Sequence, residues 1–222
     1  MKKLLSILLF LLLIVIPFSG CGTEETLDKY VSELRSDVFE GKSQSYYIRA
    51  GYGFKETPFI NDGAVGEKVN ALNFRLSGDL KDGATYTLSF SCGTETLKQD
   101  FTLNPVTHAL TAAIEVDNFT EKEFSVNVIS SGKTETVKLK SILPDDTLTS
   151  SAALKSLTEN QAELIDNFTD PDGNLKAELY MRVLVKDQKP FWYVGIASGN
   201  EQLKALLVDG VTGEVLAIRE IF

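Results

Sequence analysis

The stretch Ala84-Thr-Tyr-Thr-Leu-Ser-Phe-Ser-Cys92 decides the fold, because apolar and polar residues alternate along its whole length. Successive side chains of a β-strand point to opposite faces, so this alternation predicts a strand with one buried and one solvated face. Stretches of alternating or extended aromatic character also occupy residues 46–54, 72–76, 97–103, 110–116, 124–128 and 137–139. The chain before residue 143 is therefore predicted to be β-rich.

Turn signals separate these stretches at Asp82-Gly83, Cys92-Gly93 and Ser131-Gly132-Lys133. About seven short strands at this spacing are typical of an antiparallel β-sandwich of the immunoglobulin-like kind. The Cys–Trp–Cys core of antibody domains is missing, since the one tryptophan is Trp192. The strand topology therefore stays open.

The segment before the first strand has a different period. Apolar residues at 27, 30, 31, 34 and 38 follow helical spacing, and Gly41 is placed to end a helix. We expect a first domain of residues 27–143, which opens with a short amphipathic helix and continues as the sandwich.

A second domain, residues 146–222, is predicted after the break at Leu143-Pro144-Asp145-Asp146. Thr149 or Ser150 can cap a helix, and a tight turn follows at residues 170–173. Strands are expected at about 175–186, 191–197, 203–208 and 214–218. The expected inner face of the helix consists of Leu154, Leu157, Gln161, Leu164, Ile165 and Phe168. One helix and an antiparallel sheet indicate a small α+β domain.

The first 20 residues have the order of a secretory signal peptide. Lys2 and Lys3 precede an apolar run from Leu4 to Phe18 that is interrupted by Ser6, and small residues follow. The run is shorter than the roughly 20 residues that span a bilayer core. We therefore expect residues 1–20 to be removed.

Ser19-Gly20-Cys21 resembles the lipobox of bacterial lipoproteins, although Phe18 replaces the usual aliphatic residue. The resemblance implies that Cys21 receives a diacylglyceryl thioether and becomes the new N-terminus. Residues 21–26 would then form a short tether, and the protein would be lipid-anchored on the extracytoplasmic face of the cell membrane. The alternative is an ordinary secreted protein that is cut nearby.

Asp209, Thr212, Gly213 and Glu214 form an Asp-x-x-Thr-Gly-Glu turn between two apolar stretches. Asp and Thr bond nearby backbone in such a turn, and Gly supplies a positive φ. The turn and its flanks resemble the closing hairpin of PepSY-type domains, which are small extracytoplasmic modules, some of them thought to restrain peptidases. The first domain resembles only uncharacterised lipoproteins of Gram-positive bacteria.

Net charge argues against nucleic acid as a partner. The chain has a net charge of −9, which becomes −11 without residues 1–20, because these carry two lysines and no acid. The acids are dispersed and no run of Lys or Arg occurs, so a basic face is not expected. Membrane contact should come from acyl chains on Cys21.

Side chains with catalytic or metal-binding chemistry are few. Cys92 lies in phase with the apolar residues of its strand and is predicted to be a buried, inert core residue. His108, the one histidine, is predicted at the core margin near the start of a strand. A single histidine without a cysteine pair excludes the usual zinc sites.

Two motifs fail on their context. A calcium loop with Gly173 at its sixth position would place Phe168 and Leu179 at liganding positions. Ser130-x-x-Lys133 satisfies a hydrolase motif, but it is predicted at a hairpin tip rather than at a helix N-terminus. We therefore expect no enzyme activity, no cofactor and no metal.

Aromatic residues are the candidate binding groups. They crowd residues 46–59 and 191–193, and adjacent strand residues face opposite sides, so each cluster should turn some rings outward. Tyr52, Trp192 and Tyr193 are the candidate ligand-binding residues. The alternative is a sheet with both faces covered.

The sequence thus predicts a non-catalytic lipoprotein that acts as a protein-interaction or regulatory module at the cell surface. The alternative function is a lipoprotein that binds a small molecule or glycan with exposed aromatic rings.

Overall fold

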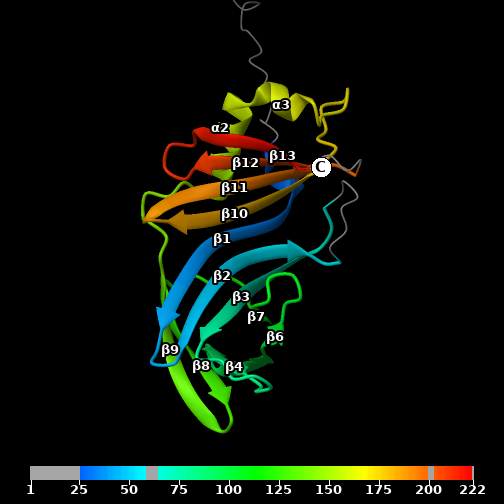
Figure 1. Cartoon of the computed structure of the whole chain (residues 1–222). Helices are drawn as coiled ribbons and strands as arrows, with labels where there is room; N and C mark the ends of the chain where they lie inside the picture. The colour runs from blue at the N-terminus through cyan, green and yellow to red at the C-terminus, as the bar shows by residue number, and fades with distance from the viewer. Residues whose placement is uncertain (1–25, 59–64, 200–202, 222) are drawn as a thin grey trace, which may run out of the picture.

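The computed structural model describes residues 26–58, 65–199 and 203–221 (Figure 1). Cys21, the predicted signal peptide of residues 1–20 and Phe59 lie outside these residues. No helix within the described ranges is long and apolar enough to cross a membrane. The helical elements are η1 (Leu27–Tyr30), α2 (Ser150–Asn160) and α3 (Ala162–Asp166). The strands are β1 (Val31–Lys42), β2 (Tyr46–Glu56), β3 (Lys68–Gly78), β4 (Thr87–Cys92), β5 (Glu95–Asp100), β6 (Thr102–Leu103), β7 (Leu110–Glu115), β8 (Glu123–Ser130), β9 (Lys133–Ser141), β10 (Glu178–Lys186), β11 (Lys189–Ala197), β12 (Leu203–Asp209) and β13 (Val215–Ile221).

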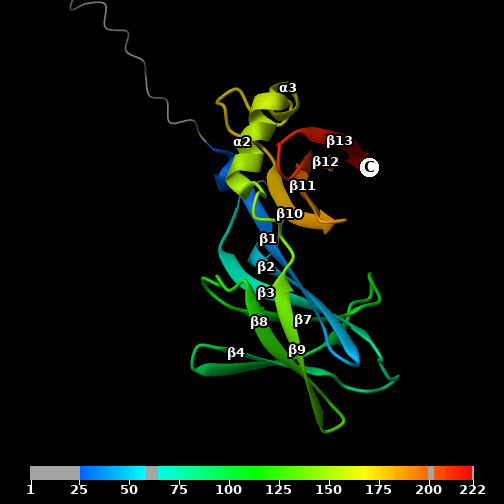
Figure 2. The same cartoon turned by 90° about the vertical axis from the view of Figure 1, so that its left-hand side faces the viewer.

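The β-rich prediction is confirmed, and these strands form one large, mainly antiparallel sheet. Its main path runs β13-β12-β11-β10-β1-β2-β3-β7-β6, while β9 pairs with β1 and β8, and β4 pairs with β8 and β5. The pairing of β1 with β10 is parallel and joins the two halves of the chain. At the lower end the sheet curls, so that β8 and β9 lie across from β2 and β3 (Figures 1 and 2).

The predicted helix from Leu27 to Val38 is wrong beyond Tyr30, where β1 begins. Consecutive residues of β1 are buried, both at 31–33 and at Val38 and Phe39, so both faces of the strand are covered at these two places, while residues 34–37 are half-buried. A β-bulge between Arg35 and Asp37 shifts the alternation by one residue. Together these two effects give the apolar residues a spacing like that of a helix. The segment forms a strand because it pairs with β2, β9 and β10.

Helices close the upper core (Figure 2). Thr149 caps α2, because its hydroxyl accepts the Ala152 N–H at 3.2 Å, as predicted. The helix ends at Asn160, and a second short helix, α3, follows instead of one continuous helix. Leu154 and Leu157 of α2 pack on one face of β10–β12, where Trp192 is fully buried.

A second core lies within the curled part of the sheet. It takes residues from β2 and β3 on one side and from β4, β8 and β9 on the other, among them Ile48, Phe74, Leu88, Val126 and Leu139. No helix contributes to this core within the described residues. The two cores are adjacent along β1, because Val38 belongs to the upper one and Phe39 to the lower one.

Two predicted positions need correction. Cys92 packs against the lower core, but it is half-buried rather than buried, because it ends β4. His108 is exposed rather than at the core margin. It takes a φ of +52° in the turn before β7, where its N–H bonds the Asn104 carbonyl at 2.9 Å.

Candidate binding groove on the open face of the sheet

The three candidate aromatic residues lie in three different environments. Trp192 is 1% exposed, and its indole N–H donates to the Leu148 carbonyl at 3.0 Å, so its ring lies in the core. Tyr52 is half-buried against the lower core, and its hydroxyl accepts the Phe119 N–H at 3.1 Å. Tyr193 is half-buried on the opposite face of the sheet from Trp192. The structure does not bring these rings together into one site.

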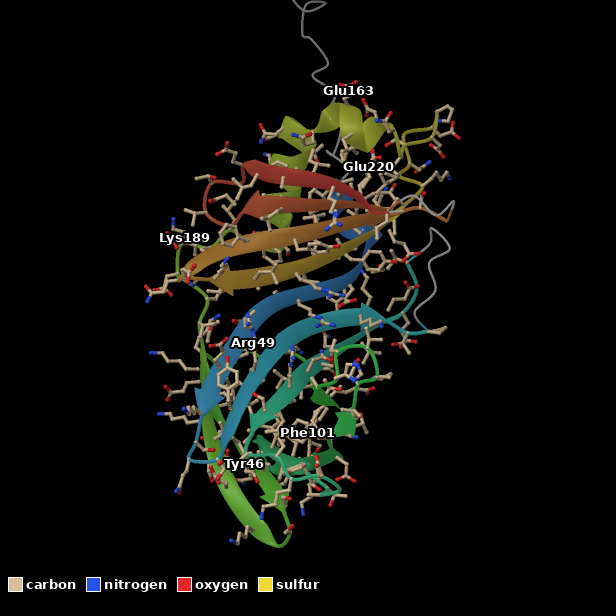
Figure 3. All side chains as sticks on the ribbon, in the orientation of Figure 1. Tyr46, Arg49, Phe101, Glu163, Lys189 and Glu220 are labelled. Atoms are coloured by element: carbon tan, nitrogen blue, oxygen red, sulfur yellow. The ribbon has the colours of Figure 1, made fainter. Side chains whose placement is uncertain are left out.

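A larger feature is a groove on the open face of the sheet, with a volume of about 870 Å³. Strands β10, β1, β2, β3 and β7 form it, and residues 99–107 border it. Four of the chain's five arginines line it, and we call it the arginine groove. The four are Arg35, Arg49, Arg75 and Arg182. Arg49 lies on the face of β2 that Figure 3 turns toward the viewer.

Strand register arranges the arginines in two pairs. Arg35 on β1 is the direct partner of Arg182 on β10. Arg49 on β2 is the direct partner of Arg75 on β3. Direct partners share a face and lie about 5 Å apart, so each pair concentrates two positive charges.

Carboxylates neutralise only part of this charge. Glu33 is buried and accepts from Arg35 Nε at 2.8 Å and from Arg182 Nη2 at 3.3 Å, so two guanidinium groups share one carboxylate. Glu40 contacts Arg49 at 3.5 Å, and Arg75 has no ion pair with any described residue. The side chains of Arg35 and Arg182 are 42% exposed and that of Arg49 is 41% exposed, so a ligand can reach them.

Small residues form the floor between the two pairs. Gly51, Asn73 and Ala113 are partners in adjacent strands and line the groove. Gly53, opposite Arg35, is required by a close approach, because a Cβ there would lie 1.8 Å from the Leu34 carbonyl oxygen. A Cβ on Gly51 would instead make only an ordinary contact at 3.5 Å. The floor is thus low and can accept a side chain at position 51.

Tyr47 and Tyr180, two residues before Arg49 and Arg182 in their strands and thus on the same face of the sheet, stay protonated at neutral pH. Burial, and then the hydrogen bond to Glu40, raise the pKa of Tyr47 to about 12. Burial, and then the charge of Glu178, raise the pKa of Tyr180 to about 12. Tyr193 is the register partner of Arg182 and so lies on the same face, beside the groove.

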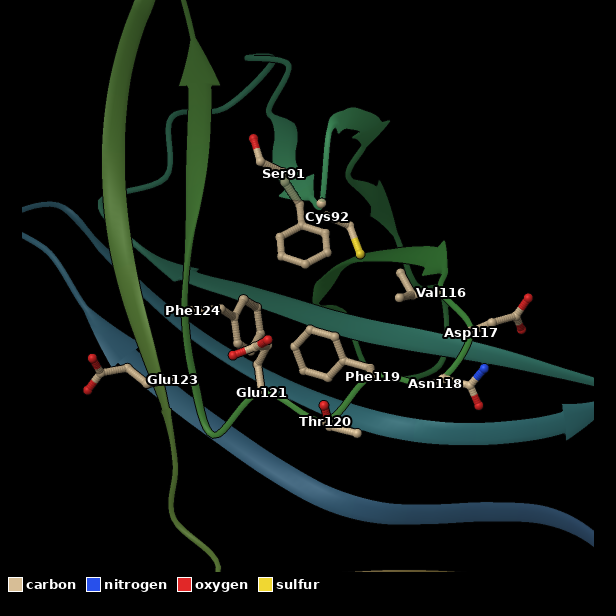
Figure 4. Close-up of a pocket in the computed structure, with 12 residues that line it drawn as sticks. Ser91, Cys92, Val116, Asp117, Asn118, Phe119, Thr120, Glu121, Glu123 and Phe124 are labelled. Carbon is tan, nitrogen blue, oxygen red and sulfur yellow. The ribbon is translucent and has the colours of Figure 1, made fainter.

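A smaller pocket of about 260 Å³ lies at the edge of the lower core (Figure 4). The rings of Phe90, Phe119 and Phe124 line it, and Cys92 points into it. Phe119 and Phe124 pack edge to face with centroids 5.0 Å apart, which fixes the pocket wall.

The remaining motifs behave as structural elements. Ser131 and Gly132 have φ of +50° and +75° at the tip of the β8–β9 hairpin, where Ser130 pairs with Lys133, as predicted. In the 170–173 turn, Gly173 N–H bonds the Asp170 carbonyl at 3.0 Å. No cluster of His, Cys, Asp or Glu suitable for a metal ion occurs among the described residues.

The predicted hairpin at residues 209–214 is confirmed. β12 pairs with β13, and Gly213 has a φ of +77°. The Asp209 carboxylate accepts the N–H groups of Val211 and Thr212, each at 2.9 Å. The turn also docks on the helix, because Ser156 Oγ of α2 donates to the Gly213 carbonyl at 2.9 Å.

Sequence reasoning missed the arginine groove. The arginines lie at 35, 49, 75 and 182, so no local run or spacing connects them. The available signal was that Arg49 and Arg75 fall on the polar phase of their strands. Comparison of the chain with protein-family models, with curated proteins and with solved structures found no match.

Proposed function

We propose that this chain is a non-catalytic binding module, anchored through Cys21 on the outer face of the cell membrane, with a protein-interaction or regulatory role. The observation that carries the binding role is the arginine groove. It combines an accessible hollow on a broad sheet with four charged side chains whose positions are set by strand register. Such convergence of polar groups in a concave surface is typical of a binding site.

Anchoring is supported by the charged start, the apolar run and the Ser19-Gly20-Cys21 sequence. Replacing Cys21 with Ala should abolish incorporation of labelled palmitate and cleavage before residue 21. A variant that still takes up palmitate would contradict the anchor.

The finer organisation is part of the proposal. The lower hydrophobic cluster lies wholly within residues 27–143 and supports an immunoglobulin-like sandwich there. The upper cluster consists mainly of residues after 146, joined by Leu27, Val31 and Val38, and with the 209–214 hairpin it supports a PepSY-like α+β unit at 146–222. β1 joins the units through its parallel pairing with β10. Pieces 22–144 and 146–222 should each unfold cooperatively. If neither folds alone, the chain is one continuous domain.

The binding role is tested by a photo-crosslinking residue at a groove position in living cells. Thr111, the register partner of Arg75, is suitable, and Lys189 at the exposed end of β11 is the matched control. We expect a crosslinked partner protein from position 111 but not from position 189. This crosslink should be lost when Cys21 is changed to Ala. Equal products from both positions, or none, would contradict a groove-based partner.

The smaller pocket favours the alternative of a small-molecule binder, because aromatic rings and Cys92 line it. Its volume of about 260 Å³ lies below the roughly 300–1,000 Å³ of typical ligand sites. The arginine groove is therefore the stronger candidate.

A further inference from the structure

We propose that the arginine groove binds an extended acidic segment of a partner protein, whose carboxylates engage the two arginine pairs. This inference names the ligand chemistry of the binding function proposed above and rests on it.

The choice of arginine over lysine is the first argument. The chain has 17 lysines, yet no described lysine lines the groove, whereas four of five arginines do. A solvated positive face could use either residue. The planar guanidinium fork, however, matches a carboxylate with two parallel hydrogen bonds. The composition of the groove therefore indicates recognition of oxyanions rather than general positive charge.

Uncompensated charge is the second argument. Arg35 and Arg182 share the single carboxylate of Glu33, and Nε of Arg182 is buried without a hydrogen-bond partner in the described structure. Arg75 is exposed and unpaired within the described residues. Asp37, which also lines the groove, is taken by Lys122 at 2.8 Å, so Glu33 is the one carboxylate paired with these three arginines among the described residues. A ligand that supplies carboxylates would complete their hydrogen bonding.

The spacing of the pairs indicates an extended chain. Gly53, which pairs with Arg35, follows Arg49 by four residues along β2, so the two positions share one face of the strand. Strand geometry then separates the pair centres by about 14 Å along the strands and about 10 Å across them, or about 17 Å on the diagonal. An extended peptide covers that distance in about five residues.

The groove lining also argues against a uniform polyanion. Asp37 and Asp100 line the same groove, and Asp100, which has no ion pair with a described residue, would repel an evenly charged phosphate polymer, whereas Asp37 is paired with Lys122 at 2.8 Å. A peptide with separated acidic residues can place neutral residues beside these two aspartates. Between the pairs, the floor of Gly51, Asn73 and Ala113 leaves depth for its side chains.

The test uses the full chain in a non-ionic detergent and a labelled peptide of Gly, Ser and Thr with two Glu-Glu pairs about five residues apart. Because adjacent residues of an extended chain face opposite sides, one glutamate of each pair should face the groove. Fluorescence anisotropy should show binding that weakens with salt, and a peptide with Gln for Glu should not bind.

Three variants localise the binding. Arg49→Gln with Arg75→Gln should weaken it about tenfold or more, as lost charge-assisted hydrogen bonds imply. Arg49→Lys with Arg75→Lys keeps the charge and should weaken it less. Gly51→Leu should block the floor without removing a charge. Arg219→Gln, at the exposed arginine of β13 that lies outside the groove, is the matched control and should bind as the parent does.

Several outcomes would overturn the inference: equal binding of the Gln peptide, unchanged binding by Arg49→Gln with Arg75→Gln, or stronger competition by polyphosphate than by the acidic peptide. A crosslink in cells at position 111 that survives those two arginine changes would overturn it too, while leaving the proposed binding function intact. If the Glu peptide binds and the Gln peptide does not, but no crosslink forms in cells, the ligand chemistry is supported and the proposed protein partner is contradicted.

Discussion

The upper core is closed by helices, whereas the lower core is closed by the sheet itself. α2 and α3 cover one face of β10–β12, and the curl of the sheet brings β8 and β9 over β2 and β3. β1 contributes to both cores through the neighbouring residues Val38 and Phe39. In both regions one face of the sheet is used for packing, and this leaves the opposite face of β10, β1, β2 and β3 free to form the arginine groove.

The strongest test of this comparison is a matched pair of cavity variants. Leu157 of α2 and Leu139 of β9 are both fully buried, one in each core. Leu157→Ala and Leu139→Ala should each lower the free energy of unfolding by about 2–5 kcal/mol. Fluorescence of Trp192 reports the upper core directly.

We expect both variants to shift the transition that Trp192 reports, because β1 carries adjacent residues of the two cores. If Leu139→Ala lowers the overall stability but leaves the Trp192 transition in place, the cores unfold independently and β1 does not couple them.

The second prediction concerns the contact between the 209–214 turn and the helix layer. Gly213 has a φ of +77°, and a Cβ there would lie 2.4 Å from Ser156 Oγ. The backbone strain alone costs on the order of 1–2 kcal/mol, and displacement of Ser156 adds to it. Gly213→Val should therefore lower the melting temperature by several degrees, whereas Thr212→Ser should change it much less. A Gly213→Val protein that melts like the parent would remove the main support for the proposed PepSY-like unit.

The third prediction compares a matched tyrosine in each region. Tyr30 accepts the Leu175 N–H at the upper core, and Tyr52 accepts the Phe119 N–H at the lower core, both at 3.1 Å. Tyr30→Phe and Tyr52→Phe should each cost about 1 kcal/mol, because each leaves one backbone N–H without its acceptor. Denaturant midpoints at constant m-value measure both. A cost at one tyrosine only would show that the other N–H finds water instead.

Local pattern was sufficient wherever one face of a strand is buried and the other solvated. The period of two located β2, β3, β8 and β9, and the capping Thr149 and the turn residues at 209–214 marked the boundaries correctly. These features depend on neighbours within a few residues. Burial on both faces and a bulge remove that signal, and this is why β1 was predicted as a helix.

The groove could not be predicted for a different reason. Arg35 and Arg182 become neighbours only through the parallel pairing of β1 with β10, which joins positions far apart in the sequence. The aromatic prediction failed at Trp192 because the helix layer covers that face, and a sequence of alternating residues does not state which face is covered. Register and layer order are tertiary properties, so the site follows from the fold rather than from a motif.

The smallest expected effect compares two carboxylates at low pH. The backbone N–H groups of Thr212 and then Val211 hold the pKa of Asp209 below its usual range in the upper region. In the lower region, the hydrogen bond from Lys138 holds the pKa of Glu123 below its usual range. A carboxylate with a lowered pKa stabilises the fold above its unfolded pKa of about 4, and the contribution is lost as the pH falls through the lower folded value. The stability deficits of Asp209→Asn and Glu123→Gln should therefore be present at neutral pH and shrink in acid.

The two carboxylates should differ in how their stability deficits respond to salt. The Lys138–Glu123 pair is exposed, so added salt should screen it and reduce the deficit of Glu123→Gln at neutral pH. Asp209 bonds neutral backbone groups, so its deficit should respond less to salt. Denaturant midpoints of parent and variants, compared at neutral and acid pH with and without salt, measure both differences. If Asp209→Asn matches the parent at every pH, the charge of the Asp209 carboxylate does not stabilise the turn, and the backbone bonds of the β12–β13 hairpin are sufficient.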